Sequence, residues 1–162
     1  GKVPEALIDD AVKRILRKKF ELGLFDDPFR FGNVQREKDA INNQQHRTIA
    51  RDVAQKSIVL LKNQNGLLPL SKSYKTIAVI GPLAKSKEDM LGFWNVPWAD
   101  NSDVLSLYEG IEKKIGSGTK LLYSKGAEIN DTSRAGFDDA VKTALHDDVV
   151  DVSVGEKRDM SG

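Results

Sequence analysis

The sequence predicts an α/β fold in which helices wrap a mostly parallel sheet, and three observations support this class. The run 76–80 is short and apolar throughout, which is typical of a strand covered on both faces. From this run onward, strand and helix patterns alternate as βαβαβ. The chain has 162 residues, whereas a complete (β/α)8 barrel takes about 250, so such a barrel is excluded.

The first sixty residues are predicted to be mainly helical. Apolar residues recur at spacings of three and four over 3–20, with Pro4 in the first turn and Gly23 as the stop signal. The aromatic segment 23–33 has no period and is interpreted as an ordered strap. A second helix is expected over 39–56.

The remaining elements follow from short apolar runs and their boundaries. We expect an additional strand at 58–61, and Ser102 as the N-cap of a helix over 104–115. The other expected elements are strands at 76–80, 120–127 and 149–154 and a helix over 137–145. Within the last strand Asp151 interrupts the apolar pattern, and its carboxylate would be costly to bury without a partner.

Composition excludes several classes of function. The 25 Lys and Arg residues balance 24 Asp and Glu, so the net charge of +1 gives no general attraction to nucleic acid or acidic membranes. No apolar run approaches the roughly 20 residues that span a bilayer. The chain has no Cys and only two isolated histidines, His46 and His146, which we interpret as surface residues. We therefore expect no cofactor, assign no metal-ligating residue, and expect neither nucleic acid nor a membrane as partner.

Two loops carry candidate binding residues. Gly81 ends a strand, but the residues after it match neither G-x-G-x-x-G nor the Walker pattern, which disfavours a nucleotide site. Trp94 and Trp98 lie in the polar loop 92–101, where an indole either packs against the protein or serves as a platform for a sugar ring. Glu156 follows a strand with three more charges, and on this pattern alone a solvated turn is favoured over the rim of a cleft.

Several blocks, taken in order, resemble glycoside hydrolase family 3, with most similarity to its periplasmic β-glucosidase branch. The blocks are IDDAV (8–12), LGLF (22–25), SIVLLKN (57–63), LLPL (67–70), GPLA (81–84), GFW (92–94), VGE (154–156) and MSG (160–162). The chain has Phe93 before the tryptophan, where a smaller residue is common in the family. The resemblance covers nearly the whole chain and agrees with the α/β pattern.

The resemblance implies that the chain is a piece of a larger enzyme. Residues 1–23 would be the last helix of an N-terminal barrel, 24–47 an interdomain linker, and 48–162 the first half of a C-terminal α/β/α sandwich. Retaining glycoside hydrolysis needs two carboxyl groups about 5 to 5.5 Å apart. The resemblance places the nucleophilic Asp in the barrel and the acid/base Glu directly after Ser161-Gly162, so this segment would supply no catalytic residue.

The resemblance also implies a function and a place. The parent protein would be a retaining β-glucosidase, periplasmic or secreted, that removes terminal β-linked glucose from oligosaccharides or β-glucosides. Its partners would be that substrate and the remainder of the same polypeptide. This segment would contribute the acceptor-side wall of the active site through Trp94, Met160 and Ser161, with Glu156 as an alternative pocket carboxylate. The alternative function is a non-catalytic α/β carbohydrate-binding or scaffold module.

Overall fold

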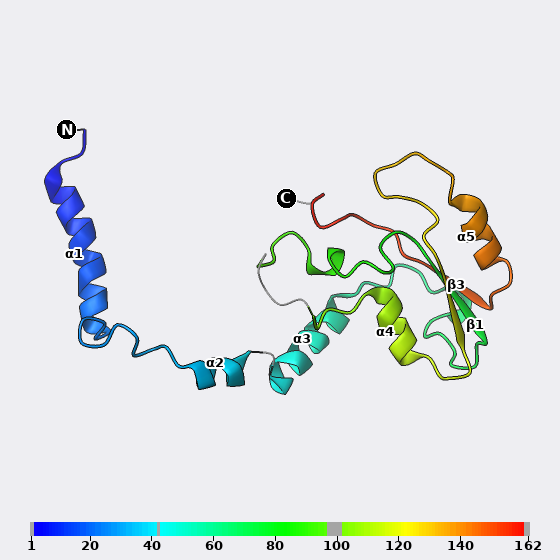
Figure 1. Ribbon diagram of the computed structural model, residues 1–162, viewed down its shortest axis with the longest axis horizontal. Coiled ribbons are helices and arrows are strands. Elements are labelled where there is room, and N and C mark those ends of the chain that lie inside the picture. Colours follow the sequence, from blue (N-terminus) through cyan, green and yellow to red (C-terminus); the bar gives the residue numbers. More distant parts are fainter. Residues whose placement is uncertain (1, 42, 97–101, 161–162) are drawn as a thin grey trace. The chain divides into compact units, whose positions relative to one another are not determined.

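The computed structural model describes residues 2–41, 43–96 and 102–160, and Figure 1 follows the chain through them. The chain divides into two compact units, one ending at Lys62 and the other beginning at Asn63. The predicted divisions after residues 23 and 47 concern a larger protein and stay predictions.

The first unit consists of helices that begin at well-defined caps. They are α1 (Glu5–Glu21), α2 (Val34–Ala40) and α3 (Gln44–Ser57). The side chain of Asn33 accepts a hydrogen bond from the backbone N–H of Arg36 at 2.8 Å. Asn43 accepts from the backbone N–H of His46 at 2.9 Å. These two asparagines satisfy amides that the first turn of a helix leaves without a partner.

Two sequence predictions for this unit are wrong. The single helix expected over 39–56 is divided, because Ile41 has an extended backbone and Asn43 caps a new helix. The strand expected at 58–61 does not form, and all four of its side chains are exposed. A strand needs a neighbour to pair with, and no other described segment pairs with this run.

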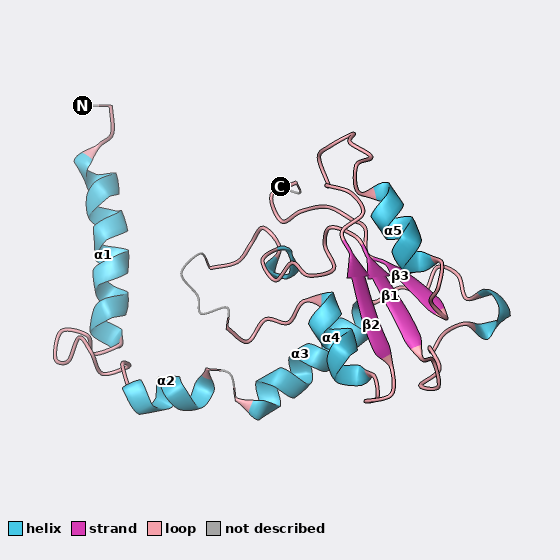
Figure 2. Ribbon diagram, turned by 45° about the vertical axis from the view of Figure 1, so that its right-hand side comes forward, coloured by secondary structure: helices cyan, strands magenta, loops and turns pink. Residues whose placement is uncertain are grey.

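The second unit contains a three-stranded parallel sheet, shown in Figure 2. Its strands are β1 (Thr76–Ile80), β2 (Lys120–Ser124) and β3 (Val149–Val152), in the order β2-β1-β3. In the register, Ile77 of the central strand lies opposite Leu121 on one side and Val149 on the other. The predicted α/β class with a mostly parallel sheet is confirmed.

Helices α4 (Leu107–Lys114) and α5 (Phe137–Ala144) lie on opposite faces of this sheet (Figure 2). The core on the α4 face contains Ile77, Val79 and Ala84, with partly buried side chains from α4 packed against them. On the other face, Gly126 lies close to both Ile80 and Ala140 of α5. A central strand buried on both faces explains why the run 76–80 is apolar throughout.

The N-cap of helix α4 is Ser106 and not Ser102, so the predicted N-cap is wrong. Ser106 is 3% exposed and forms a capping box with Glu109. The capping box satisfies two backbone amides at once. The prediction at Ser102 considered only the serine and not a glutamate three residues later.

Two short 3-10 turns also belong to this unit, at Gln64–Gly66 and Asp89–Leu91. Among the described residues no helix combines the length and apolar character needed to cross a membrane.

Candidate functional site

The loops after β1 and β3 leave the same edge of the sheet, because the strands are parallel and their carboxyl ends lie together. Gly81 makes this close passage possible. Its φ is +137°, and a Cβ at this position would lie 2.0 Å from the carbonyl oxygen of Ser153. The N–H of Ser153 donates to the carbonyl of Ile80 at 2.7 Å. The sheet edge therefore holds the starts of both loops in a fixed relation.

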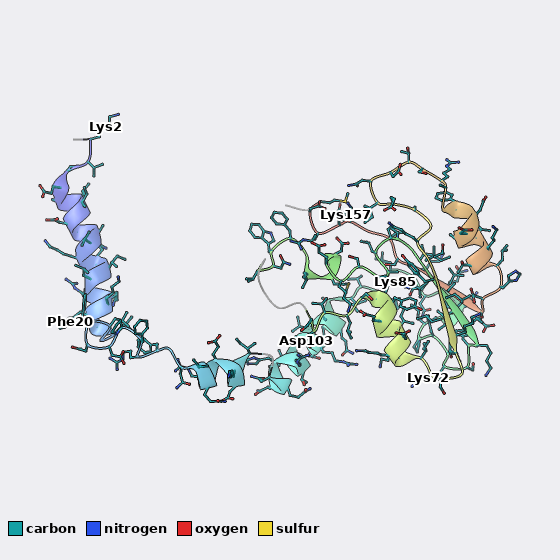
Figure 3. The ribbon with its side chains drawn as sticks, in the orientation of Figure 1. Lys2, Phe20, Lys72, Lys85, Asp103 and Lys157 are labelled. Carbon is teal, nitrogen blue, oxygen red and sulfur yellow. The ribbon has the colours of Figure 1, made fainter. Side chains whose placement is uncertain are left out.

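The first part of the loop after β1 is anchored to the domain. The carbonyl of the buried Ala84 accepts a hydrogen bond from the N–H of Tyr108 at 2.9 Å. The Lys85 ammonium, labelled in Figure 3, lies 4.3 Å from the ring centres of both Tyr108 and Tyr123. A cation between two aromatic faces is attracted to each of them. These contacts join the loop to α4 and β2.

Further along this loop, Trp94 is 89% exposed. Its indole meets the Phe93 ring edge to face, with centroids 5.3 Å apart and an angle of 85° between the planes. Most of the indole surface is thus in contact with solvent. Trp98, the second candidate in this loop, lies outside the described residues.

The loop after β3 ends in a tight turn. The N–H of Met160 donates to the carbonyl of Lys157 at 3.1 Å, which closes a turn with Arg158 at its second position. The Met160 side chain is 45% exposed, and Ser161 lies outside the described residues. Glu156 is exposed, and no hydrogen bond or ion pair to it is found in the described part of the chain.

Sequence reasoning missed the residue that connects the two loops, Asp89. Its Oδ1 accepts a hydrogen bond from the backbone N–H of Arg158 at 2.9 Å, and its Oδ2 accepts from the hydroxyl of Ser86 at 2.6 Å. The Ser86 hydrogen bond, followed by the Arg158 amide, lowers the pKa of Asp89, and the charges of Lys157 and Arg158 add to this. The spacing Ser86-x-x-Asp89 is that of a local side-chain turn, but nothing in the sequence points to Arg158.

A polar hollow of about 370 Å³ lies where these loops meet, and Lys157 marks it in Figure 3. It is lined by Glu88, Asp89, Lys157, Arg158 and Asp159. The Arg158 guanidinium Nη1 also donates to Glu88 Oε1 at 2.9 Å. The structure therefore brings the loops that carry Trp94 and Met160 together through the residues around Asp89.

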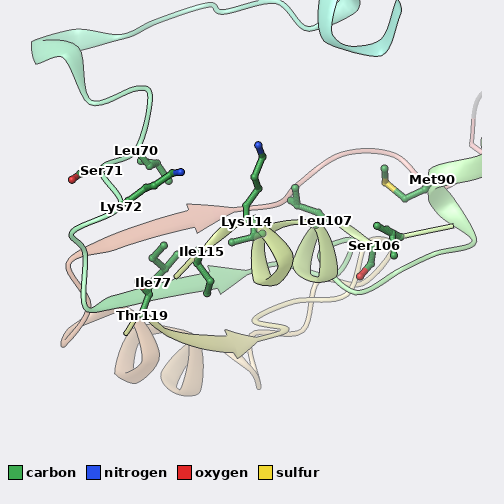
Figure 4. A pocket seen from close by; sticks show the side chains of 13 residues that line it. Leu70, Ser71, Lys72, Ile77, Met90, Ser106, Leu107, Lys114, Ile115 and Thr119 are labelled. Carbon is green, nitrogen blue, oxygen red and sulfur yellow. The ribbon is translucent and has the colours of Figure 1, made fainter. Parts of the chain in front are cut away.

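A larger cavity of about 600 Å³ runs beside α4 (Figure 4). Leu70, Ile77, Leu107, Ile111 and Ile115 contribute to an almost wholly apolar lining. Sugar hydroxyls need polar partners, so this groove is chemically unsuited to a carbohydrate. The size of a cavity does not identify the site here.

Asp151 departs from the apolar pattern of β3 and is half-buried. It pairs in register with Val79 and occupies the same face of the strand as Val149. Burial raises the pKa of its carboxyl, as expected for a carboxylate that loses solvent.

Within the described ranges, no three His, Asp or Glu side chains are grouped as a metal would require.

The fold and its joined loops define an α/β domain with a candidate ligand site at the carboxyl edge of a parallel sheet. Residues 58–162 match the sequence model of the glycosyl hydrolase family 3 C-terminal domain. The chain therefore belongs to glycoside hydrolase family 3.

Individual relatives agree with this assignment. The chain is 40% identical to a periplasmic β-glucosidase of Salmonella typhimurium over 99% of its length, and 36% identical to a β-xylosidase of Formosa agariphila over 96%. The crystal structure of a β-glucosidase from Listeria innocua with isofagomine covers all of the chain, at 37% identity and a TM-score of 0.82.

The chain is much shorter than these relatives. It spans 24% of the Salmonella protein, 22% of the Formosa protein and 22% of the Listeria chain. The family is shown by the matching sequence model and by relatives named as β-glucosidase and β-xylosidase.

Proposed function

We propose that this chain is part of a retaining β-glucosidase that hydrolyses terminal β-linked glucose from oligosaccharides or β-glucosides. Family membership and the relatives named β-glucosidases support the reaction. Solved structures of the Listeria enzyme are described with glucose and with gluconolactone, which supports a glucose-type substrate. The name of the Salmonella relative supports a periplasmic or secreted location.

The segment contributes the acceptor-side wall of the active site, and the exposure of Trp94 is the observation that carries this proposal. The Trp94 ring is 89% exposed and offers a free apolar face on a loop rich in polar residues. One face of a pyranose presents C–H bonds that suit such a surface. Phe93 meets this ring edge to face and limits its orientation.

Met160, Ser161 and Glu156 complete the proposed wall. Met160 stands on the turn that Asp89 holds, and Ser161 follows it directly in the sequence. Glu156 is an exposed carboxylate on the same loop, available to sugar hydroxyls as an acceptor. The nucleophile and the acid/base belong to residues outside this segment.

The remainder of the same polypeptide is the partner that completes the site. In this proposal residues 1–23 form the last barrel helix, 24–47 the linker and 48–162 the first half of the sandwich. The apolar side chains of α1 support the first assignment, because they are exposed within the chain and suit burial against a barrel. The exposed residues are Leu7, Ile8, Val12, Ile15, Leu16 and Phe20.

Hydrolysis of chromogenic substrates tests the proposal. The complete polypeptide should release nitrophenol from p-nitrophenyl β-D-glucoside, and the chain of residues 1–162 should release none. The corresponding β-xyloside is the second substrate, because several relatives are β-xylosidases. Turnover by the isolated chain would show that both acids lie within it. Sugar binding by an inactive complete polypeptide would favour the non-catalytic module.

The role of Trp94 is tested in the complete polypeptide with Trp94→Ala. Loss of a stacking face should raise KM for cellobiose about fivefold, as expected from roughly 1 kcal/mol per aromatic contact. Phe29→Ala is the matched control, because Phe29 is also an exposed aromatic but lies in the first unit. Unchanged kinetics on cellobiose would remove Trp94 from the site.

A further inference from the structure

The turn 157–160 is held by a contact to its backbone. Arg158 occupies the second position of the turn, where the N–H points away from the hydrogen bond that closes it. That N–H donates to Asp89 Oδ1 at 2.9 Å. An ionised acceptor makes this a strong hydrogen bond.

The carboxylate of Asp89 is itself held in place. Ser86 donates to Oδ2 at 2.6 Å, and the same hydroxyl oxygen accepts from the N–H of Asp89 at 3.2 Å. The ion pair of Arg158 with Glu88 is a weaker connection, because the Glu88 side chain is 75% exposed. Asp89 is therefore the principal link between the two loops among the described residues.

Both residues of this link lie close in the sequence to residues of the proposed acceptor-side wall. Asp89 precedes Trp94 by five residues, and Arg158 precedes Met160 by two. We propose that Asp89 is a positioning residue: its carboxylate fixes the turn 157–160 against the loop that carries Trp94 and so sets the shape of the acceptor-side wall. This inference rests on the proposed function and adds to it a residue that touches no sugar.

Four variants of the complete polypeptide separate this role from general stability. Asp89→Ala removes both acceptor oxygens. Asp89→Asn keeps an oxygen for the Arg158 amide and an N–H for Ser86, so it is the conservative variant. Arg158→Pro removes the donor at a turn position that accommodates proline, and Arg158→Ala is its matched control, because it keeps the N–H.

Steady-state kinetics with cellobiose provide the first readout. Asp89→Ala and Arg158→Pro should each raise KM about tenfold, a loss consistent with one charged hydrogen bond, and leave kcat within about threefold. Arg158→Ala should stay within about twofold of the unmodified protein, because it loses only an exposed ion pair. Asp89→Asn keeps a neutral acceptor for the Arg158 amide, so its KM should lie between those of the unmodified protein and Asp89→Ala. The double variant Asp89→Ala/Arg158→Pro should be no worse than the more impaired single variant, because both changes remove one contact.

Amide hydrogen exchange at Arg158 provides a readout that is independent of activity. Exchange should be slow in the unmodified complete polypeptide and at least tenfold faster in Asp89→Ala. If the unmodified protein hydrolyses neither glucoside nor cellobiose, the proposed function fails, and exchange alone decides whether Asp89 holds the turn. Unchanged exchange in Asp89→Ala overturns the link. Faster exchange with unchanged KM, or additive effects in the double variant, overturns the positioning role.

Discussion

The two units of this chain differ in how much apolar surface they bury. Up to Lys62, only Gly23, Leu24 and Asn43 among the described residues are partly covered, and none is buried. From Asn63 onward, Ile77, Ala78, Val79 and Ala84 form a buried core. The helices of the first unit are specified by caps and periodicity, whereas the second unit is specified by packing around one strand.

The difference shows that an amphipathic pattern indicates where apolar contact is needed, not where it is found. Val12 of α1 is 50% exposed, whereas Val79 of β1 is completely buried. Both belong to clear apolar patterns. Only Val79 packs against other apolar side chains of this chain. The exposed apolar surface of the first unit is suited to burial against other parts of a larger protein.

The largest expected effect within the second unit comes from Gly81→Ala. The added Cβ would meet the Ser153 carbonyl oxygen at 2.0 Å, at a φ that disfavours residues with a side chain. We expect a loss of about 3 kcal/mol in the free energy of unfolding. Urea unfolding of dilute chain 1–162, followed by pulse proteolysis, measures it.

Gly110→Ala is the control for this change. Gly110 lies inside α4, and a Cβ there would have no atom within 4 Å. The substitution should stabilise the sheet unit by up to about 1 kcal/mol, since alanine favours the helix. Equal effects at both glycines would contradict the close backbone approach at Gly81.

A pair of valines tests the comparison of the two units directly. Val79→Ala deletes two buried methyl groups and should cost the second unit about 2 kcal/mol. Val12→Ala should change the free energy of unfolding of that same unit by less than about 0.5 kcal/mol. Protease resistance of residues 63–162 across a urea series reports both. A large effect of Val12→Ala would show that the first unit supports the second.

The smallest effect is a pH dependence at the start of α4. The Lys87 ammonium and then the Ser106 amide donate hydrogen bonds to the Glu109 carboxylate, and they lower its pKa from 4.5 to about 2. Because the folded pKa is the lower one, its stabilisation is present above pH 4.5 and is lost as pH falls toward 2.

Glu109→Gln provides the measurement for this pH dependence. The thermal midpoint of the unmodified chain should exceed that of the variant near pH 6, and the two should converge as pH approaches 2. A constant difference across this range would show that Glu109 acts only through its shape.

The sequence predicted the alternating strands and helices well, because the run 76–80 is apolar throughout, as packing on two faces requires. It failed at 58–61, where an apolar run lacks a strand to pair with, and at Ser102, where a better capping box stands four residues later. Trp94 was recognised as a candidate from its loop and residue type. Asp89 was missed because its function depends on a backbone amide distant in the sequence.

The order of the strands has a consequence for how the sheet is made. The central strand β1 is synthesised first, yet both of its neighbours come later in the chain. The backbone groups of β1 therefore have no strand to pair with, and its apolar side chains stay uncovered, until the ribosome has completed β2 and then β3. Parallel pairing between distant segments is intrinsically slow, so this interval is when the nascent protein is most open to unwanted association.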